Sequence, residues 1–134
     1  MAADLSATLR NALLAGYETT FTAGSLKFRS GSKPAAITDP STGTVGATIT
    51  LPADCFTAPS GGSVSKNGTW SVAASASATI AHYELCDSGG TVHERGSVTT
   101  TGGGGDVTVD NITTEVGQTV TVTSWTATIP ATSA

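Results

Sequence analysis

Charged residues are scarce in this chain of 134 residues. Only 12% of the side chains are Asp, Glu, Lys or Arg, and the formal net charge is −4. The six cationic residues are scattered, whereas a protein that binds nucleic acid needs a basic stripe to neutralise the phosphates. We therefore expect no nucleic-acid partner.

Long apolar runs are also missing. No stretch reaches the roughly twenty apolar residues that a membrane-spanning helix needs. The first residues lack the basic region and the apolar run of a secretory signal. We expect no membrane partner and a protein made in the cytoplasm.

Cysteine is nearly absent, because Cys55 and Cys86 are the only two. Their separation excludes a CxxC metal knuckle or redox motif. Thiols in the cytoplasm usually stay reduced and are buried as small hydrophobic groups. We favour two free cysteines, with a structural disulfide as the alternative.

The chain is rich instead in Gly, Ser, Thr and Ala, which favours strands and turns over helices. Its most regular part is residues 106–130, where Val107 and Val109, then Val120 and Val122, alternate with polar residues. A period of two predicts two half-buried antiparallel strands. The apolar phase then shifts toward Trp125, which predicts a bulge near Thr123 and Ser124.

Other segments support an all-β chain. Residues 25–29 and 45–51 alternate and predict strands, and residues 31–44, with two prolines and two glycines, predict a long exposed loop. The dipeptide Asn67-Gly68 predicts a hairpin between the short strands that flank it. We therefore expect an antiparallel β-sandwich or jelly-roll-like domain of about seven or eight strands.

Residues 81–98 predict a further hairpin with a two-residue turn at Ser88-Gly89. Its cross-strand pairs would be Leu85 with Val92, Glu84 with His93, and His82 with Arg95. In this register Glu94 falls on the inner face, where it needs Tyr83 or a backbone group as a partner.

The same hairpin carries residues that could bind a metal. His82, Glu84 and His93 would share one face, and these residue types bind zinc where they converge. Arg95 opposite His82 would repel a cation, so we favour an ordinary polar surface and expect no metal and no other cofactor.

An enzyme is not expected either. The chain has no GxSxG elbow, and the glycine run 102–105 lacks the Lys-Ser/Thr of a phosphate loop, so we interpret it as a mobile turn. Trp70 and Trp125 could stack on a sugar, but each is in phase with core aliphatic residues, and we place both in the core.

Residues 1–17 predict the only helix, ending at Gly16, as an amino-terminal arm before a β-sandwich domain of residues 18–134. One face of this helix carries Leu5, Leu9 and Leu13. A helix this short is marginal alone, so the leucine face must dock on its own domain or on another subunit. Both alternatives stay open.

Several segments follow one another in a recognisable order: the helix LSATLRNALL, the strand SLKFRSG with a Lys-Pro loop, ATITLP, SGGSVSKNGTW, AHYELCDSGGTVHERGSV and GGGGDVTVDNITTEVGQTVTVTSWT. In these strand and turn patterns the chain resembles a family of small proteins encoded among bacteriophage head and tail genes. The resemblance covers nearly the whole chain and includes no catalytic signature.

This resemblance implies a β-rich structural protein of the virion. The first hypothesis is a decoration or cement protein, made in the host bacterial cytoplasm, that binds the outer face of the capsid and stabilises it by non-covalent contacts. Its partners would be the major capsid protein and itself, as a homodimer or homotrimer. The alternative is a tail, collar or fibre component that binds host-surface carbohydrate. The candidate partner-binding residues are Leu5, Leu9, Leu13, Lys33, Pro34, Pro40, Phe56 and Pro59.

Overall fold

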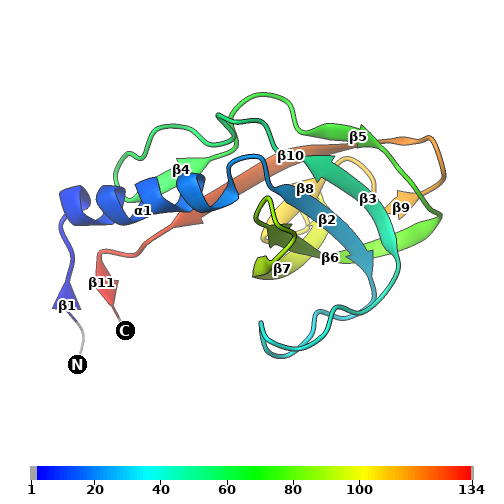
Figure 1. The fold of residues 1–134 in the computed structure, drawn as a ribbon, viewed down its shortest axis with the longest axis horizontal. Helices are drawn as coiled ribbons and strands as arrows, with labels where there is room; N and C mark the ends of the chain where they lie inside the picture. The colour runs from blue at the N-terminus through cyan, green and yellow to red at the C-terminus, as the bar shows by residue number, and fades with distance from the viewer. Residues whose placement is uncertain (1–2, 134) are drawn as a thin grey trace.

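The computed structural model describes residues 3–133 and is mostly β, with 44% strand and 12% helix. The expectation of a β-rich chain with one amino-terminal helix is therefore confirmed (Figure 1). The elements are β1 (Ala3–Asp4), α1 (Ala7–Phe21), β2 (Ser25–Ser30), β3 (Val45–Thr50), β4 (Ser63–Ser65), β5 (Ser71–Ala73), β6 (Ala78–Cys86), β7 (Val92–Thr100), β8 (Val107–Val109), β9 (Thr113–Thr114), β10 (Thr119–Thr128) and β11 (Thr132–Ser133).

Nine of these strands form one sheet in the order β3-β2-β6-β7-β8-β10-β4, with β5 beside β10 and β9 beside β6. The pair β7–β8 is parallel and the other pairs are antiparallel. The sheet is strongly curled. Ser75, just after β5 on the β10 side of the sheet, donates its N–H to Gly46 O of β3, the strand at the opposite edge, at 2.9 Å. A two-layer antiparallel sandwich or jelly roll is thus not confirmed, and the architecture is a curled mixed sheet. The remaining two strands, β1 and β11, pair with each other.

The segment of residues 106–130 is largely as predicted. β8 and β10 pair antiparallel, and their register shifts between Val122 and Ser124, where the bulge was expected. The shift keeps the side chains of Val122 and Trp125 both buried, at 1% and 3% exposed. The alternation in residues 25–29 and 45–51 likewise corresponds to β2 and β3.

The predicted Asn67-Gly68 hairpin is wrong. β4 and β5 do not pair with each other, because β4 pairs with the end of β10 and β5 with its beginning. The Asn67 side chain instead donates to the backbone oxygen of Asp54 at 3.0 Å and to its carboxylate at 3.1 Å. These contacts bind the turn to residue 54 and leave β10 as the partner of both short strands.

The hairpin of β6 and β7 exists, but its predicted register is wrong by two residues. Glu84 lies opposite Arg95, and Leu85 lies opposite Glu94. The reason is the Asp87 carboxylate, whose Oδ1 accepts from the N–H groups of Gly89 at 2.9 Å and Thr91 at 3.0 Å. This Asx-type turn makes the connection longer than two residues.

The glycine run 102–105 has a demanding structural role. It returns the chain from β7 to the parallel strand β8, a connection that normally takes a dozen or more residues. Gly102 and Gly104 have φ angles of 87° and 82°, which favour glycine. A Cβ at Gly103 would lie 2.7 Å from Cβ of Thr99, so the turn is packed against β7.

Helix α1 begins after Ser6, whose Oγ accepts from Leu9 N at 3.1 Å, and runs through Gly16 to Phe21. The predicted end at Gly16 is wrong, and the proposed boundary after residue 17 falls inside the helix. The helix docks on its own sheet with Leu14, Tyr17 and Phe21 rather than with the leucine face. In residues 3–133 no helix has the length and hydrophobicity needed to cross a membrane.

An aromatic cluster joins this helix to the sheet. Phe56 stacks on Trp125 with ring centroids 4.6 Å apart, and Tyr17 lies 5.5 Å from Phe56 and 5.7 Å from Trp125. Trp70 is 1% exposed and Trp125 3%, which confirms the prediction that both belong to the core.

Both cysteines are buried and free, as favoured from the sequence. Burial raises the pKa of the Cys55 thiol to about 11, so this side chain stays protonated and packs as a small hydrophobic group.

We predict opposite effects for two glycine-to-alanine substitutions. Gly103→Ala should lower the free energy of unfolding by about 1–3 kcal/mol, because the new methyl group overpacks against Thr99. Gly16→Ala, in open space on α1, should raise it by up to about 1 kcal/mol through helix propensity. Urea denaturation of both variants is the measurement. Equal effects would show that the glycine turn adjusts freely to a side chain.

Candidate functional site: a groove in the sheet

A groove opens in the sheet where β8 begins. β8 starts only at Val107, so the first part of β7 and the last part of β10 have no strand between them. The groove has a cavity volume of about 480 Å³. Leu14 and Tyr17 of α1 contribute to its lining, together with residues 125–128 of β10 and Ile129 directly after it. We call it the β7–β10 groove.

Three polar side chains gather in this groove. The Tyr83 hydroxyl donates to Oε2 of Glu94 at 2.6 Å, so Tyr83 satisfies the inward carboxyl as the sequence suggested. Asp106 Oδ2 accepts from the N–H of Ser97 at 2.9 Å and from its hydroxyl at 3.1 Å. A Cβ at Gly96 would lie 2.6 Å from the Tyr83 ring and 2.8 Å from Asp106 Oδ2, so the cluster requires glycine there.

The acidic side chains of the groove have no counter-ion among the described residues. Burial, and next the nearby Asp106 carboxylate, raise the pKa of Glu94 to about 7. Burial also raises the pKa of Tyr83 to about 12, so Tyr83 remains a donor. Among residues 3–133, neither Glu94 nor Asp106 forms an ion pair. The Tyr17 hydroxyl is buried without a hydrogen-bond partner in the described chain. The groove can therefore accept a cation and a hydrogen-bonding group.

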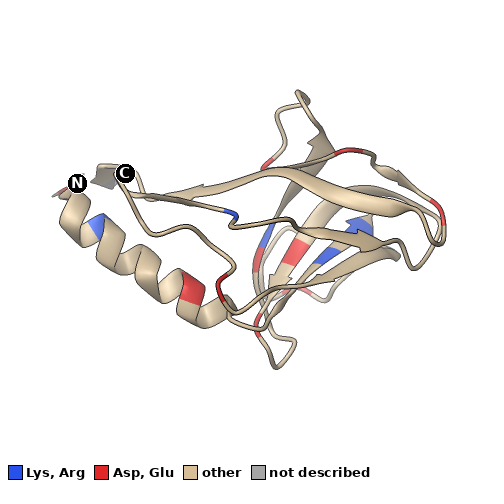
Figure 2. Cartoon of the chain, turned by 90° about the horizontal axis from the view of Figure 1, so that it is seen from above, with Lys and Arg blue, Asp and Glu red and all other residues tan. Residues whose placement is uncertain are grey.

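The neighbouring Arg95 side chain points to the other face of the sheet, into a second polar cluster. There the Glu84 side chain, 1% exposed, lies between Arg29 and Arg95 and also accepts from the Ser41 hydroxyl at 2.6 Å. Burial alone would raise the pKa of Glu84, but hydrogen bonds from Ser41, Arg29 and Arg95 outweigh it and lower that pKa. We call this cluster the Glu84 clamp. Figure 2 shows positions of both signs side by side in the sheet, away from α1.

The Glu84 clamp fastens the loop of residues 31–44 to the sheet. Arg95 donates to the backbone oxygens of Ala36 at 3.1 Å and Ile37 at 3.3 Å. Arg29 reaches Gly43 O at 3.2 Å. The loop is therefore held at several points along its length, although most of its residues are exposed as predicted.

The predicted trio His82, Glu84 and His93 does not converge. His82 and Glu84 are buried under the loop, and His82 Nδ1 lies 2.8 Å from Gly31 O. His93 is exposed and its Nε2 lies 2.8 Å from the Asp87 carboxylate. Residues 3–133 contain no cluster of three or more such residues placed to bind a metal.

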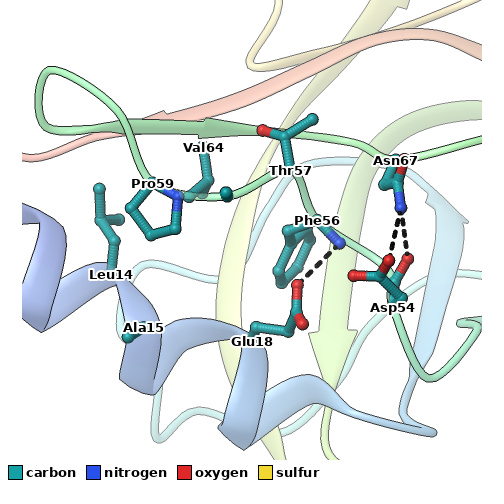
Figure 3. Close-up of a pocket in the computed structure, with 10 residues that line it drawn as sticks. Leu14, Ala15, Glu18, Asp54, Phe56, Thr57, Pro59, Val64 and Asn67 are labelled. Carbon is teal, nitrogen blue, oxygen red and sulfur yellow. Dashed lines mark hydrogen bonds between the residues drawn. The ribbon is translucent and has the colours of Figure 1, made fainter.

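A second cleft, of about 540 Å³, lies between α1 and the segment from Asp54 to Asn67. Figure 3 shows Glu18 reaching from the helix to the N–H of Phe56, at 3.2 Å, and Asn67 reaching Asp54. The carboxylate of Glu18 thereby holds the helix against the loop. The polar side chains of this cleft, Glu18, Asp54 and Asn67, already hydrogen-bond within the chain. The cleft therefore has fewer free polar groups for a ligand than the β7–β10 groove.

The sequence-predicted partner residues do not form one site. Leu9 and Leu13 are 47% and 53% exposed on the outer face of α1. Leu5 is half-buried before the helix, where its N–H donates to Ala131 O. Lys33 and Pro40 are exposed and Pro34 is half-buried, all in the clamped loop, which lies away from the start of α1 (Figure 1). Pro59 is half-buried beside the helix, and Phe56 is core rather than surface at 2% exposed.

Sequence reasoning missed most of the groove. The sequence indicates Glu94 and its partner Tyr83, because an inward carboxyl needs a hydrogen-bond donor, but it does not indicate a groove. Tyr17, Asp106 and residues 125–129 come from distant parts of the chain, and no local pattern connects them.

Comparisons of the chain with protein-family models, with curated proteins and with solved structures found no match.

We predict that Glu84→Gln lowers the free energy of unfolding by about 3 kcal/mol, because it leaves two arginines without their buried counter-charge. The loop should also become accessible to thermolysin at Ile37. Glu115→Gln, which removes an exposed carboxylate, is the matched control and should change stability by less than about 0.5 kcal/mol. Equal effects of both substitutions would contradict a structural role of the clamp.

The raised pKa of Glu94 predicts a pH-dependent stability. Between the ordinary value of 4.5 and about 7, the folded state binds the proton more tightly than the unfolded state. The free energy of unfolding should therefore fall as pH rises through this window, by on the order of 2 kcal/mol. Glu94→Gln should remove that part of the fall and be more stable than the wild type at pH 8. Urea denaturation at pH 5 and pH 8 tests this, and an unchanged slope in the variant would contradict it.

Proposed function

We propose that this chain is a structural protein of a bacteriophage virion that binds the outer face of the capsid as a decoration or cement protein. The resemblance of its strand and turn patterns supports the virion assignment. The observation that supports a binding role is the outward face of α1, where Leu9 and Leu13 are 47% and 53% exposed.

This outward face is well suited to an apolar contact. Leu14 and Phe21, 2% and 3% exposed, dock the opposite face of the helix on the sheet. The two outer leucines are therefore held in fixed positions, and ordering them on a partner costs little conformational entropy. Burying one leucine contributes about 1.5–3 kcal/mol, which is too little for firm attachment by itself. Attachment through several copies, as a homodimer or homotrimer, multiplies this contact by effective concentration.

A tail, collar or fibre component that binds host carbohydrate would need exposed aromatic faces or another sugar-binding surface. Both tryptophans are buried among core side chains, so neither offers a free ring face. We therefore place decoration first. The number of copies in purified virions distinguishes the two functions, because decoration requires many copies per particle and a tail component few.

We predict that the double substitution Leu9→Ser and Leu13→Ser abolishes binding to capsids that lack this protein. The free energy of unfolding should fall by only about 1–2 kcal/mol, because both side chains are about half exposed and serine has a slightly lower helix propensity than leucine. Sedimentation of capsids with the wild-type or variant protein measures binding.

The matched control is Leu14→Ala on the docked face of the same helix. It should lower the free energy of unfolding by about 2–4 kcal/mol through the cavity it creates. Capsid binding by the double variant at the wild-type level would contradict the proposed contact, whatever the copy number.

A further inference from the structure

At its inner end, beside Val107, the β7–β10 groove has the width of one missing strand. β8 lies between β7 and β10, so these two strands are about two strand spacings, or roughly 10 Å, apart at Val107. Before Asp106 the place of β8 is vacant, while β7 continues back to Val92 and β10 continues to Thr128. No strand of the described chain occupies this space, which is lined by side chains.

Both edges of the groove present backbone groups. In a strand, the N–H and C=O of one residue point to the same side, and those of the next residue point to the opposite side. Trp125 O and Ile129 N bond toward β4, at 3.1 and 2.9 Å, so the peptide groups of Thr126 and Thr128 face the groove.

On the other wall, Ser97 N bonds to the Asp106 side chain on the β8 side of β7, at 2.9 Å. By the same alternation, the peptide groups of Arg95 face the groove, although its side chain is in the Glu84 clamp. The groups that Arg95, Thr126 and Thr128 direct into the groove have no bonded partner within residues 3–133.

The charge of the groove complements a cationic segment. Glu94 and Asp106 stand in it without a counter-ion among the described residues, and the one hydroxyl bonded to Glu94 comes from Tyr83. The buried hydroxyl of Tyr17 is a further group without a bonded partner. A cation that entered the groove would neutralise a carboxyl pair that the protein itself leaves unpaired.

We propose that the β7–β10 groove binds an extended segment of a partner protein as an added strand, with a Lys or Arg side chain of that segment beside Glu94 and Asp106. The free peptide groups on both walls would form backbone hydrogen bonds with the bound segment. Glu94 and Asp106 would select a cationic residue at the centre of that segment. A sugar or a small amine would use the carboxyls but not the two strand edges. The inference goes beyond the virion role and does not depend on it.

The probe is a seven-residue peptide, Thr-Val-Thr-Lys-Thr-Val-Thr, blocked at both ends, with a matched peptide carrying Glu in place of Lys. Amide hydrogen exchange by NMR reads binding at single residues. We expect the N–H groups of Arg95, Thr126 and Thr128 to exchange at least about tenfold more slowly with saturating Lys peptide. The N–H of Ala127, which points to β4, should be unaffected and serves as the internal control.

Charge selection is tested with the same peptides. The Lys peptide should bind about tenfold more tightly than the Glu peptide. Glu94→Gln, or Asp106→Asn as a second variant that keeps an oxygen for Ser97, should reduce this preference several-fold. Glu115→Gln, an exposed carboxylate outside the groove, should leave it unchanged.

Unchanged exchange at Arg95, Thr126 and Thr128 at the highest soluble peptide concentration would overturn the proposal. Protection at the edge of β3 instead would overturn it as well, because the peptide would then add to the outside of the sheet. Equal affinity for the Lys and Glu peptides would refute the role of the acidic pair. None of these outcomes bears on capsid binding through α1.

Discussion

The pairing of β10 is the constraint on which the rest of the sheet depends. This strand binds β5 along its first residues, β8 in its middle and β4 along its end. The register shift at Val122 and Ser124 turns both halves of the strand toward the same core. Because β10 extends beyond β8, it also forms one wall of the β7–β10 groove. Its Trp125 lines that groove and belongs to the aromatic cluster under α1.

Local alternation was enough to predict much of the sheet, and long-range choices were not. The strands around residues 25–29, 45–51 and 107–122 follow from a period of two, which a buried face enforces. The register of the β6–β7 hairpin depends on the Asp87 side chain, and the parallel course of β8 depends on how four glycines fold back. Neither leaves a periodic signal.

The helix shows the same limit for the candidate site. Two faces of α1 carry apolar residues, and the sequence prediction chose the leucines over the face with Leu14, Tyr17 and Phe21. The aromatic side chains bury more area and find ring partners in the core, so they determine the docking. Glu94 could be identified from its inward position, whereas Tyr17 and Asp106 meet it only through the tertiary fold.

The Glu84 clamp has a consequence for how the 31–44 loop can vary. Arg95, Arg29 and His82 contact backbone oxygens of this loop, and the Ser41 side chain bonds to both Glu84 and Arg95. A main-chain oxygen does not depend on the side chain, so Ala36 and Ile37 can vary, whereas Gly31 and Gly43, with φ angles of 78° and 80°, favour glycine. The loop can therefore change the chemistry of its outward positions, Lys33 and Pro40 included, while its attachment to the sheet is kept. Such a loop is a natural place for sequence diversity between related proteins, in the way that an immunoglobulin framework tolerates different recognition loops.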